Sequence, residues 1–534
     1  RWGRRYRYMV VLDADSLMSG GLLNAMVRIM EKNPGVGILQ TFPKQIGSET
    51  LLGRVMQFAQ ALYGPAFMAG LDYWQCGEAN FWGHNAIIRL DPFIKNCALP
   101  PLPGKEPFGG HILSHDFVEA ALMRKAGYAV RLLNTPRGSY EEGPPTLVDM
   151  LKRDRRWCQG NMQHFWLLFA KGWHMMSRLN FLHGVLSYVS SLLWFIFLVL
   201  STYLAATPVL TGATQQTALA GHLLLWLTAT LIFLPKTVIL FDEMLTGRMF
   251  KPMRMRLLTL VSSLLDTIIF TLMAPVMMWF HMRFVIKIVL GQGVSWVAQR
   301  RKVGGGLDWR EIILTFGGVT LLGLVWTAVS WWVSQEQFIR SGGAGSPYGF
   351  LIWISPILVS LVLAIPVAIL LSSSQSGLRF GLFLTPSEVE PPTVLSDLED
   401  NLSEVQDRMQ AAPEIERNYG LMQVCLDPYV NGLHVSLLRR RRNAKDSQEY
   451  LAELSTRLIR QGPEALNQRE MSALMNDTDS VINLHYQLWS ATESELAPFW
   501  SQAIKQYNLA KTHPFTSLLA KSPTTAPEED VVAA

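Results

Sequence analysis

Hydrophobic and polar positions divide the chain into three regions. Over residues 1–180, short apolar runs alternate with stretches of helical periodicity, which is typical of a sheet covered by helices. Long apolar runs with few charges dominate residues 181–374, and a polar region with charged amphipathic stretches follows over 375–534. We therefore expect an α/β domain, then a transmembrane region, then a mainly helical tail.

Strand candidates alternate with helical stretches in the first region. The candidates are apolar runs at residues 8–12, 36–42, 81–90 and 128–133. A helical period over 20–33 stops at Asn33-Pro34-Gly35, and the alternation predicts a sheet of parallel type covered by helices. The chain opens without a methionine directly before the first strand, so we interpret it as a fragment whose α/β domain is incomplete at its N-terminus.

Four apolar runs in the middle region reach the roughly 20 residues that a bilayer requires. They lie at about 182–206, 218–240, 311–334 and 348–371. A fifth run, 257–290, is interrupted by Ala274-Pro275 and contains Asp266 and His281. Overall composition supports a membrane protein, because mean hydropathy is +0.18 and the chain has 17 tryptophans.

Loop charges predict how these runs are oriented. Residues 241–256 carry four Lys or Arg and residues 281–310 carry six, whereas 206–217 has none and 335–347 has one. Basic loops stay in the cytoplasm, so both ends of 257–290 should be cytoplasmic. We expect a re-entrant hairpin broken near Pro275 or an interfacial helix lying in the membrane plane. Four full crossings then return the tail to the cytoplasm, and its last residues are predicted to be disordered.

Net charge and cysteine usage limit the kinds of partner and ligand that we expect. A net charge of +5 is too small to argue for nucleic acid, and we expect no nucleic-acid partner. The four cysteines are scattered without metal-binding spacing, which is typical of reduced thiols.

Candidate chemistry begins at Asp13-Ala14-Asp15, directly after the first strand. Ligands of α/β sheets bind at this strand edge, and Mg²⁺ or Mn²⁺ prefers such hard oxygen ligands and bridges them to phosphates. The alternative is a polar exit from a strand, since this spacing occurs often by chance.

Asp116 is the second candidate for a functional residue. It precedes a helical stretch, and Glu119 three residues later completes a capping-box pattern. The functional alternative is a general base that takes a proton from a sugar hydroxyl. Both interpretations can hold together, because a helix start can direct a carboxylate into a cleft.

Aromatic and basic residues supply two further candidates. The stretch from Phe81 and Trp82 to His84 suits sugar stacking and hydroxyl binding, or else a buried strand. Arg156 and Trp157 suit phosphate binding and sugar stacking, or else a basic cluster drawn to anionic lipid.

The order of these motifs resembles the processive membrane-integrated family 2 glycosyltransferases, which include cellulose, chitin and hyaluronan synthases. Asp13 and Asp15 match that family's DxD, Asp116 matches its catalytic Asp, and Arg156 with Trp157 matches the end of Q-x-x-R-W. Arg153 stands where the family has Gln. This departure, the Ser-His-Asp motif and residues 274–301 are most similar to the glucosyltransferase H family, which makes the linear β-1,2-linked backbone of osmoregulated periplasmic glucans in Gram-negative bacteria. The resemblance covers residues 1 to about 371 well.

The resemblance implies a GT-A-type domain over 1–180 that transfers glucose from UDP-glucose, with inversion, onto a growing glucan. It implies a multi-pass protein of the bacterial inner membrane with cytoplasmic catalytic domain and tail, coupled to glucan translocation. By family analogy, an acyl carrier protein and periplasmic glucan-processing proteins are expected partners. The family's first strands would precede residue 1, so the isolated chain should bind UDP poorly and be inactive.

The resemblance also implies a role for each site residue. Asp116 would be the catalytic base, with Asp13 and Asp15 at the metal and UDP-sugar and Arg156 at the diphosphate. The acceptor would be bound by Trp157, Phe81, Trp82 and His84.

The segment 291–302 stands where cellulose synthases carry a gating loop, or it is a plain basic interfacial loop. Trp296 and Arg300 are its candidate gating residues, and Asp266 and His281 are candidate lining of a glucan path. Another polysaccharide synthase of the same family remains an alternative. A more remote one is a transporter with a cytosolic regulatory domain, which would not require this order of motifs.

Overall fold

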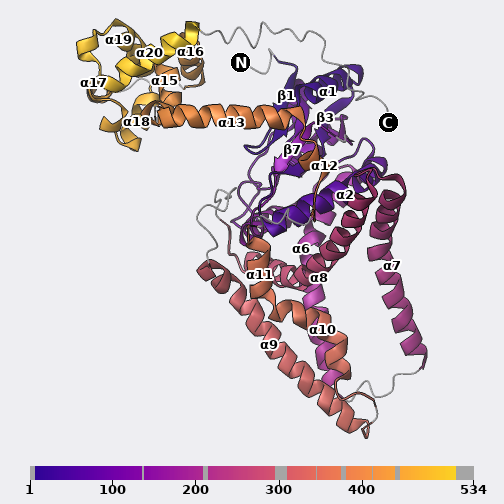
Figure 1. The fold of residues 1–534 in the computed structure, drawn as a ribbon. Helices are drawn as coiled ribbons and strands as arrows, with labels where there is room; N and C mark the ends of the chain where they lie inside the picture. Colours follow the sequence, from indigo (N-terminus) through magenta and orange to yellow (C-terminus); the bar gives the residue numbers. More distant parts are fainter. Residues whose placement is uncertain are drawn as a thin grey trace. The chain divides into compact units, whose positions relative to one another are not determined.

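The computed structural model describes residues 6–134, 137–207, 215–294, 309–343, 345–374, 381–411, 413–438 and 445–512. The chain forms two compact units, Arg1–Leu395 and Ser396–Ala534 (Figure 1). The first unit contains the α/β part and the long apolar helices, and the second is helical. The boundary lies about 20 residues beyond the one expected from composition, for a reason given below.

A four-stranded sheet forms the centre of the α/β part. Its order is β1 (Tyr8–Val11), β5 (Ala86–Arg89), β3 (Val36–Thr41) and β6 (Ala129–Leu133). β3 and β6 are parallel, as predicted, but β5 runs antiparallel to both β1 and β3. The predicted parallel-type sheet is therefore a mixed one. Thr41 N at the end of β3 donates to Asn85 O just before β5 (3.0 Å). The chain therefore enters β5 beside the end of β3, and β5 runs in the opposite direction to β3.

Helices cover both faces of this sheet. On one face, Leu22, Met26 and Met30 of α1 (Gly20–Lys32) pack against Leu39 and Ile87. On the other, α4 (His115–Lys125) packs against the residues that alternate with these along the strands. The short α3 (Leu90–Asn96) follows β5.

Three of the four predicted strands are confirmed to within one residue at either end. The candidate at 81–90 is shorter, because only residues 86–89 pair as a strand. Gln40 explains the difference: its side chain donates to Asn80 O and accepts from Trp82 N (3.0 Å). The buried side-chain amide of Gln40 thus binds the backbone groups that a neighbouring strand would otherwise bind, and residues 81–85 form a loop.

A second sheet was not predicted. It has the order β2 (Leu17–Met18), β7 (Ser139–Glu142) and β4 (Lys44–Ile46). Strands of two to four residues carry too few positions for an alternation to be recognised. This sheet places β7 beside the exit of the DxD segment.

Long apolar helices follow the α/β part. They are α6 (Met175–Ala206), α7 (Gln215–Thr246), α8 (Met253–Val289), α9 (Trp309–Arg340) and the pair α10 (Gly349–Val362) and α11 (Ala364–Ser372), bent by 51°. Within the described residues, four are long and apolar enough to cross a membrane, or five if the bent pair counts as one span. The predicted hairpin at Pro275 is wrong, because α8 is unbroken there and residues on both sides of Pro275 are buried.

Helix α2 (Leu51–Gln75) joins the α/β part to these helices. Leu51 N donates to Ser373 O (3.2 Å) after α11, and Arg54 pairs with Glu388 (2.8 Å) of α12 (Pro386–Val389). Phe58 packs edge-on against Phe383. The stretch from 381 to 389 is therefore docked on α2, and this is why the first unit extends to Leu395.

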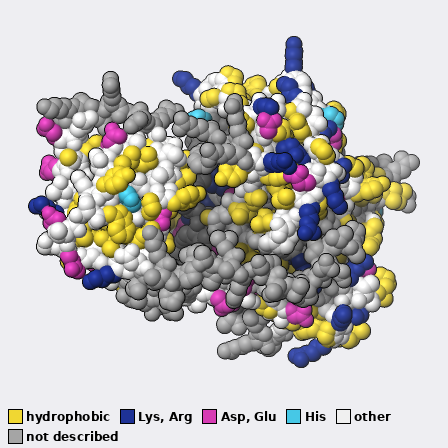
Figure 2. Space-filling model, turned by 90° about the horizontal axis from the view of Figure 1, so that it is seen from above, with side chains coloured by type: hydrophobic (Ala, Val, Ile, Leu, Met, Phe, Trp, Pro, Cys, Tyr) yellow, Lys and Arg dark blue, Asp and Glu magenta, His cyan; other side chains and the backbone are white. Residues whose placement is uncertain are grey.

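The second unit is a helical bundle whose core includes the fully buried Trp500, Leu454, Leu458 and Leu484. Two charged amphipathic stretches of this region, 395–410 and 447–460, form the helices α13 (Thr393–Ala411) and α17 (Lys445–Gln461). Figure 2 shows hydrophobic side chains gathered on one face of this unit. The predicted disordered end lies outside the described residues. The helices, with the 3-10 turns η3 and η4, are α13 (Thr393–Ala411), α14 (Pro413–Arg417), α15 (Tyr419–Leu426), α16 (Pro428–Leu437), α17 (Lys445–Gln461), η3 (Pro463–Ala465), α18 (Gln468–Met475), α19 (Thr478–Ser490), η4 (Glu493–Glu495) and α20 (Pro498–Thr512).

Candidate active site

Asp13 and Asp15 lie where β1 leaves the main sheet. Asp13 N donates to Ser16 Oγ (3.1 Å) and Ser16 N donates to Asp13 O (3.0 Å), so a tight turn holds both carboxylates at the strand exit. Asp13 is exposed and Asp15 is partly buried. Val11 pairs with Ala86, which places this turn at the end of the sheet where the loop 81–85 arrives.

The loop 81–85 divides into a buried and a polar half. Phe81 is 1% exposed in the core, and Trp82 packs against the same cluster. Their predicted acceptor role is untested, and these positions fit the alternative of a buried aromatic pair. His84 differs: its Nδ1 lies 3.0 Å from Asn85 Oδ1 and its Nε2 lies 3.6 Å from Glu141 Oε2.

Asp116 lies at the start of α4. Burial raises its pKa to about 6, against the opposing effects of His115 and backbone N–H groups at the helix start. A β-carbon built on Gly83 would lie 3.5 Å from Asp116 Oδ2, so the loop 81–85 passes directly over this carboxylate. The alternative role of Asp116 and Glu119 as a capping box is wrong, because no side-chain hydrogen bond caps the start of α4 in the described structure. Glu119 Oε1 instead lies 3.0 Å from His115 Nδ1.

Helix α5 (Leu147–Leu167) binds the residues that precede Asp116. Gln163 Oε1 accepts from Leu113 N (3.0 Å), and His164 Nε2 donates to Ser114 O (2.9 Å). Burial lowers the pKa of His164 to about 4, so this ring is neutral at physiological pH. Buried side chains of α5 thereby fix the segment that leads into the candidate base.

The Arg-Trp motif occupies the exposed side of α5. The guanidinium of Arg153 lies 4.3 Å from the centre of the Trp157 ring, and Trp157 is 43% exposed. Burial and Arg153 lower the pKa of Arg156, and the carboxylate of Asp13 opposes this shift. Arg156 therefore lies within electrostatic range of the Asp13 carboxylate.

Glu141 is a member of this site that the sequence did not reveal. It lies on β7, and burial raises its pKa. Asp15 and Asp13 raise that pKa further, while His84 and Arg153 lower it. Glu141 thus faces the DxD segment, the polar half of the loop 81–85 and α5 together. The stretch Ser-Tyr-Glu-Glu offers no motif or clean alternation by which it would be found.

The two predicted channel residues that the structure describes lie apart from each other. Asp266 is completely buried and pairs with Lys236 of α7 (3.1 Å) and Tyr63 of α2 (3.0 Å). His281 Nε2 instead lies 3.2 Å from Asp154 of α5. Trp296 and Arg300 are outside the described residues. The chain approaches them beside α5, because Gln159 Oε1 accepts from Val294 N (2.7 Å).

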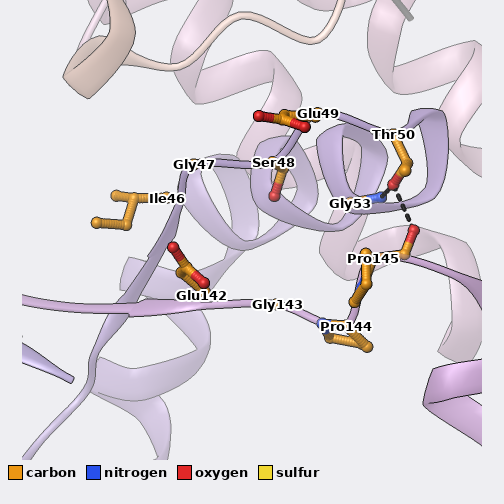
Figure 3. Close-up of a pocket in the computed structure, with 10 residues that line it drawn as sticks. All are labelled: Ile46, Gly47, Ser48, Glu49, Thr50, Gly53, Glu142, Gly143, Pro144 and Pro145. Carbon is orange, nitrogen blue, oxygen red and sulfur yellow. Dashed lines mark hydrogen bonds between the residues drawn. The ribbon is translucent and has the colours of Figure 1, made fainter. Parts of the chain in front are cut away.

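A pocket lies between the second sheet and the start of α2 (Figure 3). Glu142 lines it and points toward Gly47, where an added β-carbon would lie 3.7 Å from Glu142 Oε1. Neighbouring residues of a strand point to opposite faces of the sheet, so the side chains of Glu141 and Glu142 lie in different surroundings.

The DxD segment fits a divalent cation held largely by a substrate. Within the described part of the chain, no three His, Cys, Asp or Glu side chains are grouped to hold a metal by themselves. Mg²⁺ is commonly bound through one or two carboxylates together with substrate phosphates and water. Asp13 and Asp15 provide two such carboxylates, and both raise the pKa of Glu141.

Comparisons with known proteins agree with this chemistry. The family model for glycosyl transferase family group 2 matches residues 8–286, so the chain belongs to this family. Its relatives include proteins named glucans biosynthesis glucosyltransferase H. One from Pseudomonas fluorescens is 42% identical over 94% of this chain, and one from Cupriavidus pinatubonensis is 41% identical over 92%. The chain spans 58% and 56% of these two relatives, respectively.

Proposed function

We propose that the complete protein is an inverting glucosyltransferase that polymerises glucose from UDP-glucose into a linear β-1,2-linked glucan. The observation that supports this proposal is that the Asp13–Asp15 turn leaves β1 at the end of the sheet where the loop 81–85 arrives, and that this loop passes over the Asp116 carboxylate. The names of the relatives support the glucan product. The apolar helices support a multi-pass inner-membrane protein with its catalytic part and tail in the cytoplasm, coupled to translocation of the product.

Asp116 is the proposed general base. Its carboxylate accepts the proton of the acceptor 2-hydroxyl while that oxygen attacks C1 of the donor glucose in line. The bond from C1 to the UDP oxygen breaks, and the configuration at C1 inverts. A pKa of about 6 leaves the carboxylate ionised near neutral pH yet basic enough to take the proton.

The leaving diphosphate is bound by charge. Arg156 provides a guanidinium suited to phosphate oxygens. Asp13 and Asp15 would hold Mg²⁺ or Mn²⁺, which supplies charge neutralisation at the diphosphate when bound. Trp157, supported by Arg153, offers the flat exposed surface on which the terminal glucose stacks.

Linkage analysis of the product tests this function. Membranes containing the complete protein are incubated with radiolabelled UDP-glucose, and we expect a β-1,2-linked glucan that is lost in the Asp116→Asn variant. A different linkage or donor would identify another polysaccharide synthase of the family. Substrate movement without sugar transfer would favour a transporter. The proposed partners, acyl carrier protein and periplasmic processing proteins, are tested by co-purification with the complete protein.

A further inference from the structure

We propose that Glu141, together with His84, binds hydroxyl groups of the terminal acceptor glucose and determines which hydroxyl faces Asp116. This inference rests on the proposed function. It adds Glu141 to His84, which the resemblance already assigns to the acceptor, and it gives the two residues together the role of fixing the rotation of the acceptor sugar.

The position of the pair is set by the loop 81–85. Gly83 passes over the Asp116 carboxylate, and His84, the next residue, faces Glu141. The base and the proposed pair are therefore connected by two consecutive residues of one loop. The side chains of His84 and Glu141 are 20% and 23% exposed, so both remain accessible to a ligand.

Hydrogen bonding determines what the pair can recognise. Asn85 Nδ2 donates to Ser139 Oγ (2.8 Å), which leaves Asn85 Oδ1 to accept from His84 Nδ1 (3.0 Å). In a neutral His84, this makes Nε2 an acceptor, and it faces the acceptor oxygens of Glu141 at 3.6 Å. Two facing acceptors require donors, and the adjacent hydroxyls of a glucose ring provide two of them.

The surroundings suit a sugar in this position. Arg153 lowers the pKa of Glu141 and also lies over the Trp157 ring at 4.3 Å, so one guanidinium is shared by the surroundings of the proposed pair and the aromatic surface. A ring stacked on Trp157 would present its hydroxyl edge to polar groups, while Asp116 takes the proton of one hydroxyl. The rival role, a third metal ligand beside Asp13 and Asp15, predicts a different dependence on the cation.

The test uses Glu141→Gln in the complete protein in membranes, with Glu142→Gln as the matched control on the same strand. A β-1,2-linked glucose disaccharide is the added acceptor, and initial rates are measured against disaccharide, UDP-glucose and Mn²⁺. We expect the disaccharide KM to rise about tenfold in Glu141→Gln, because one of the two side-chain oxygens that can accept hydrogen bonds is replaced by an amide donor. We also expect a larger share of other linkages in the product. KM for UDP-glucose and the half-saturating Mn²⁺ concentration should stay as in the unmodified protein, as should all values for Glu142→Gln.

Each contrary result has a distinct meaning. An unchanged disaccharide KM and unchanged linkage in a stably expressed Glu141→Gln variant would overturn the inference alone. A raised Mn²⁺ requirement with unchanged disaccharide KM would overturn it in favour of a metal ligand. Absence of any glucan from the unmodified protein would instead refute the proposed function.

Discussion

Asp116 combines two opposing influences within one carboxyl group. The helix start and His115 stabilise its charged form, yet burial dominates and raises its pKa to about 6. Below this value the carboxyl is mostly protonated and cannot accept a proton, so the rate of glucan synthesis should fall about fivefold as pH drops from 6 to 5. Rates measured between pH 5 and 8 at saturating UDP-glucose check this. A rate that stays constant down to pH 5 would contradict the assignment of Asp116 as the base.

Single residues were predictable from sequence where a motif order existed. The proposed roles of Asp13, Asp15, Asp116, Arg156 and Trp157 were all assigned in this way. Residue type alone did not determine burial, since the loop 81–85 has aromatic residues packed in the core beside a histidine that faces the site. Glu141 escaped detection because its proximity to the DxD segment arises from long-range pairing of β7 with β2.

At the scale of elements, the close packing of α5 against the start of α4 is a testable feature. A β-carbon on Gly160 would lie 2.1 Å from Ser114 Oγ and 2.8 Å from Ser114 N. Gly160→Ala must therefore push α5 away from the segment that positions Asp116, at a cost of roughly 1–3 kcal/mol. We expect a large loss of kcat with a lowered Tm.

Gly70→Ala is the control for this change. It substitutes the same residue type within a helix, and an added β-carbon there meets no atom within 4 Å among the described residues. The gain in helix propensity should leave its activity unchanged and its stability equal or slightly higher. Equal behaviour of the two variants would show that contact between α5 and Ser114 does not position the base.

Elements with a clear period were predictable, and their partners were not. The helix at 20–33 and the apolar helices follow from side-chain periodicity and length. The backward direction of β5 depends on a hydrogen bond between Thr41 and Asn85, and the shortening of its candidate run depends on the side chain of Gln40. Such contacts between distant residues leave no local pattern in the sequence.

At the scale of the whole first unit, α2 anchors the segment that follows the last apolar helix. The Arg54 side chain is 7% exposed and bonds Glu388 Oε1 at 2.8 Å. Glu388→Ala leaves this buried guanidinium without its carboxylate, which should destabilise the unit by roughly 1–3 kcal/mol. Thermal unfolding of the detergent-solubilised protein measures the loss. Asp91→Ala, which breaks the exposed pair with Lys95, should have almost no effect, and equal Tm values for both variants would refute the anchoring role.

The path of α8 relative to the membrane is the remaining question at this scale. With 37 residues the helix is about 55 Å long, well beyond the roughly 30 Å of a hydrocarbon core. In its first half, Ser263 and Asp266 bond Tyr63 of α2, and in its second half His281 bonds Asp154 of α5. Figure 1 shows α8 beside α6, with which it also packs. Because both halves contact helices that precede the apolar region and both flanking loops are basic, we expect α8 to lie along the cytoplasmic interface.

Cysteine accessibility separates this arrangement from a full crossing. Cysteines placed singly at the exposed Met253 and Gln292 flank α8 on either side. Both should react with a membrane-impermeant maleimide only when the cytoplasmic face is opened, whereas a cysteine at the exposed Ile339, near the end of α9, should react from the periplasmic face. Labelling of Met253 and Gln292 positions from opposite faces would make α8 a span. The tail would then lie on the opposite side of the membrane from the α/β part, so the same three variants decide whether the second unit shares a compartment with the catalytic site.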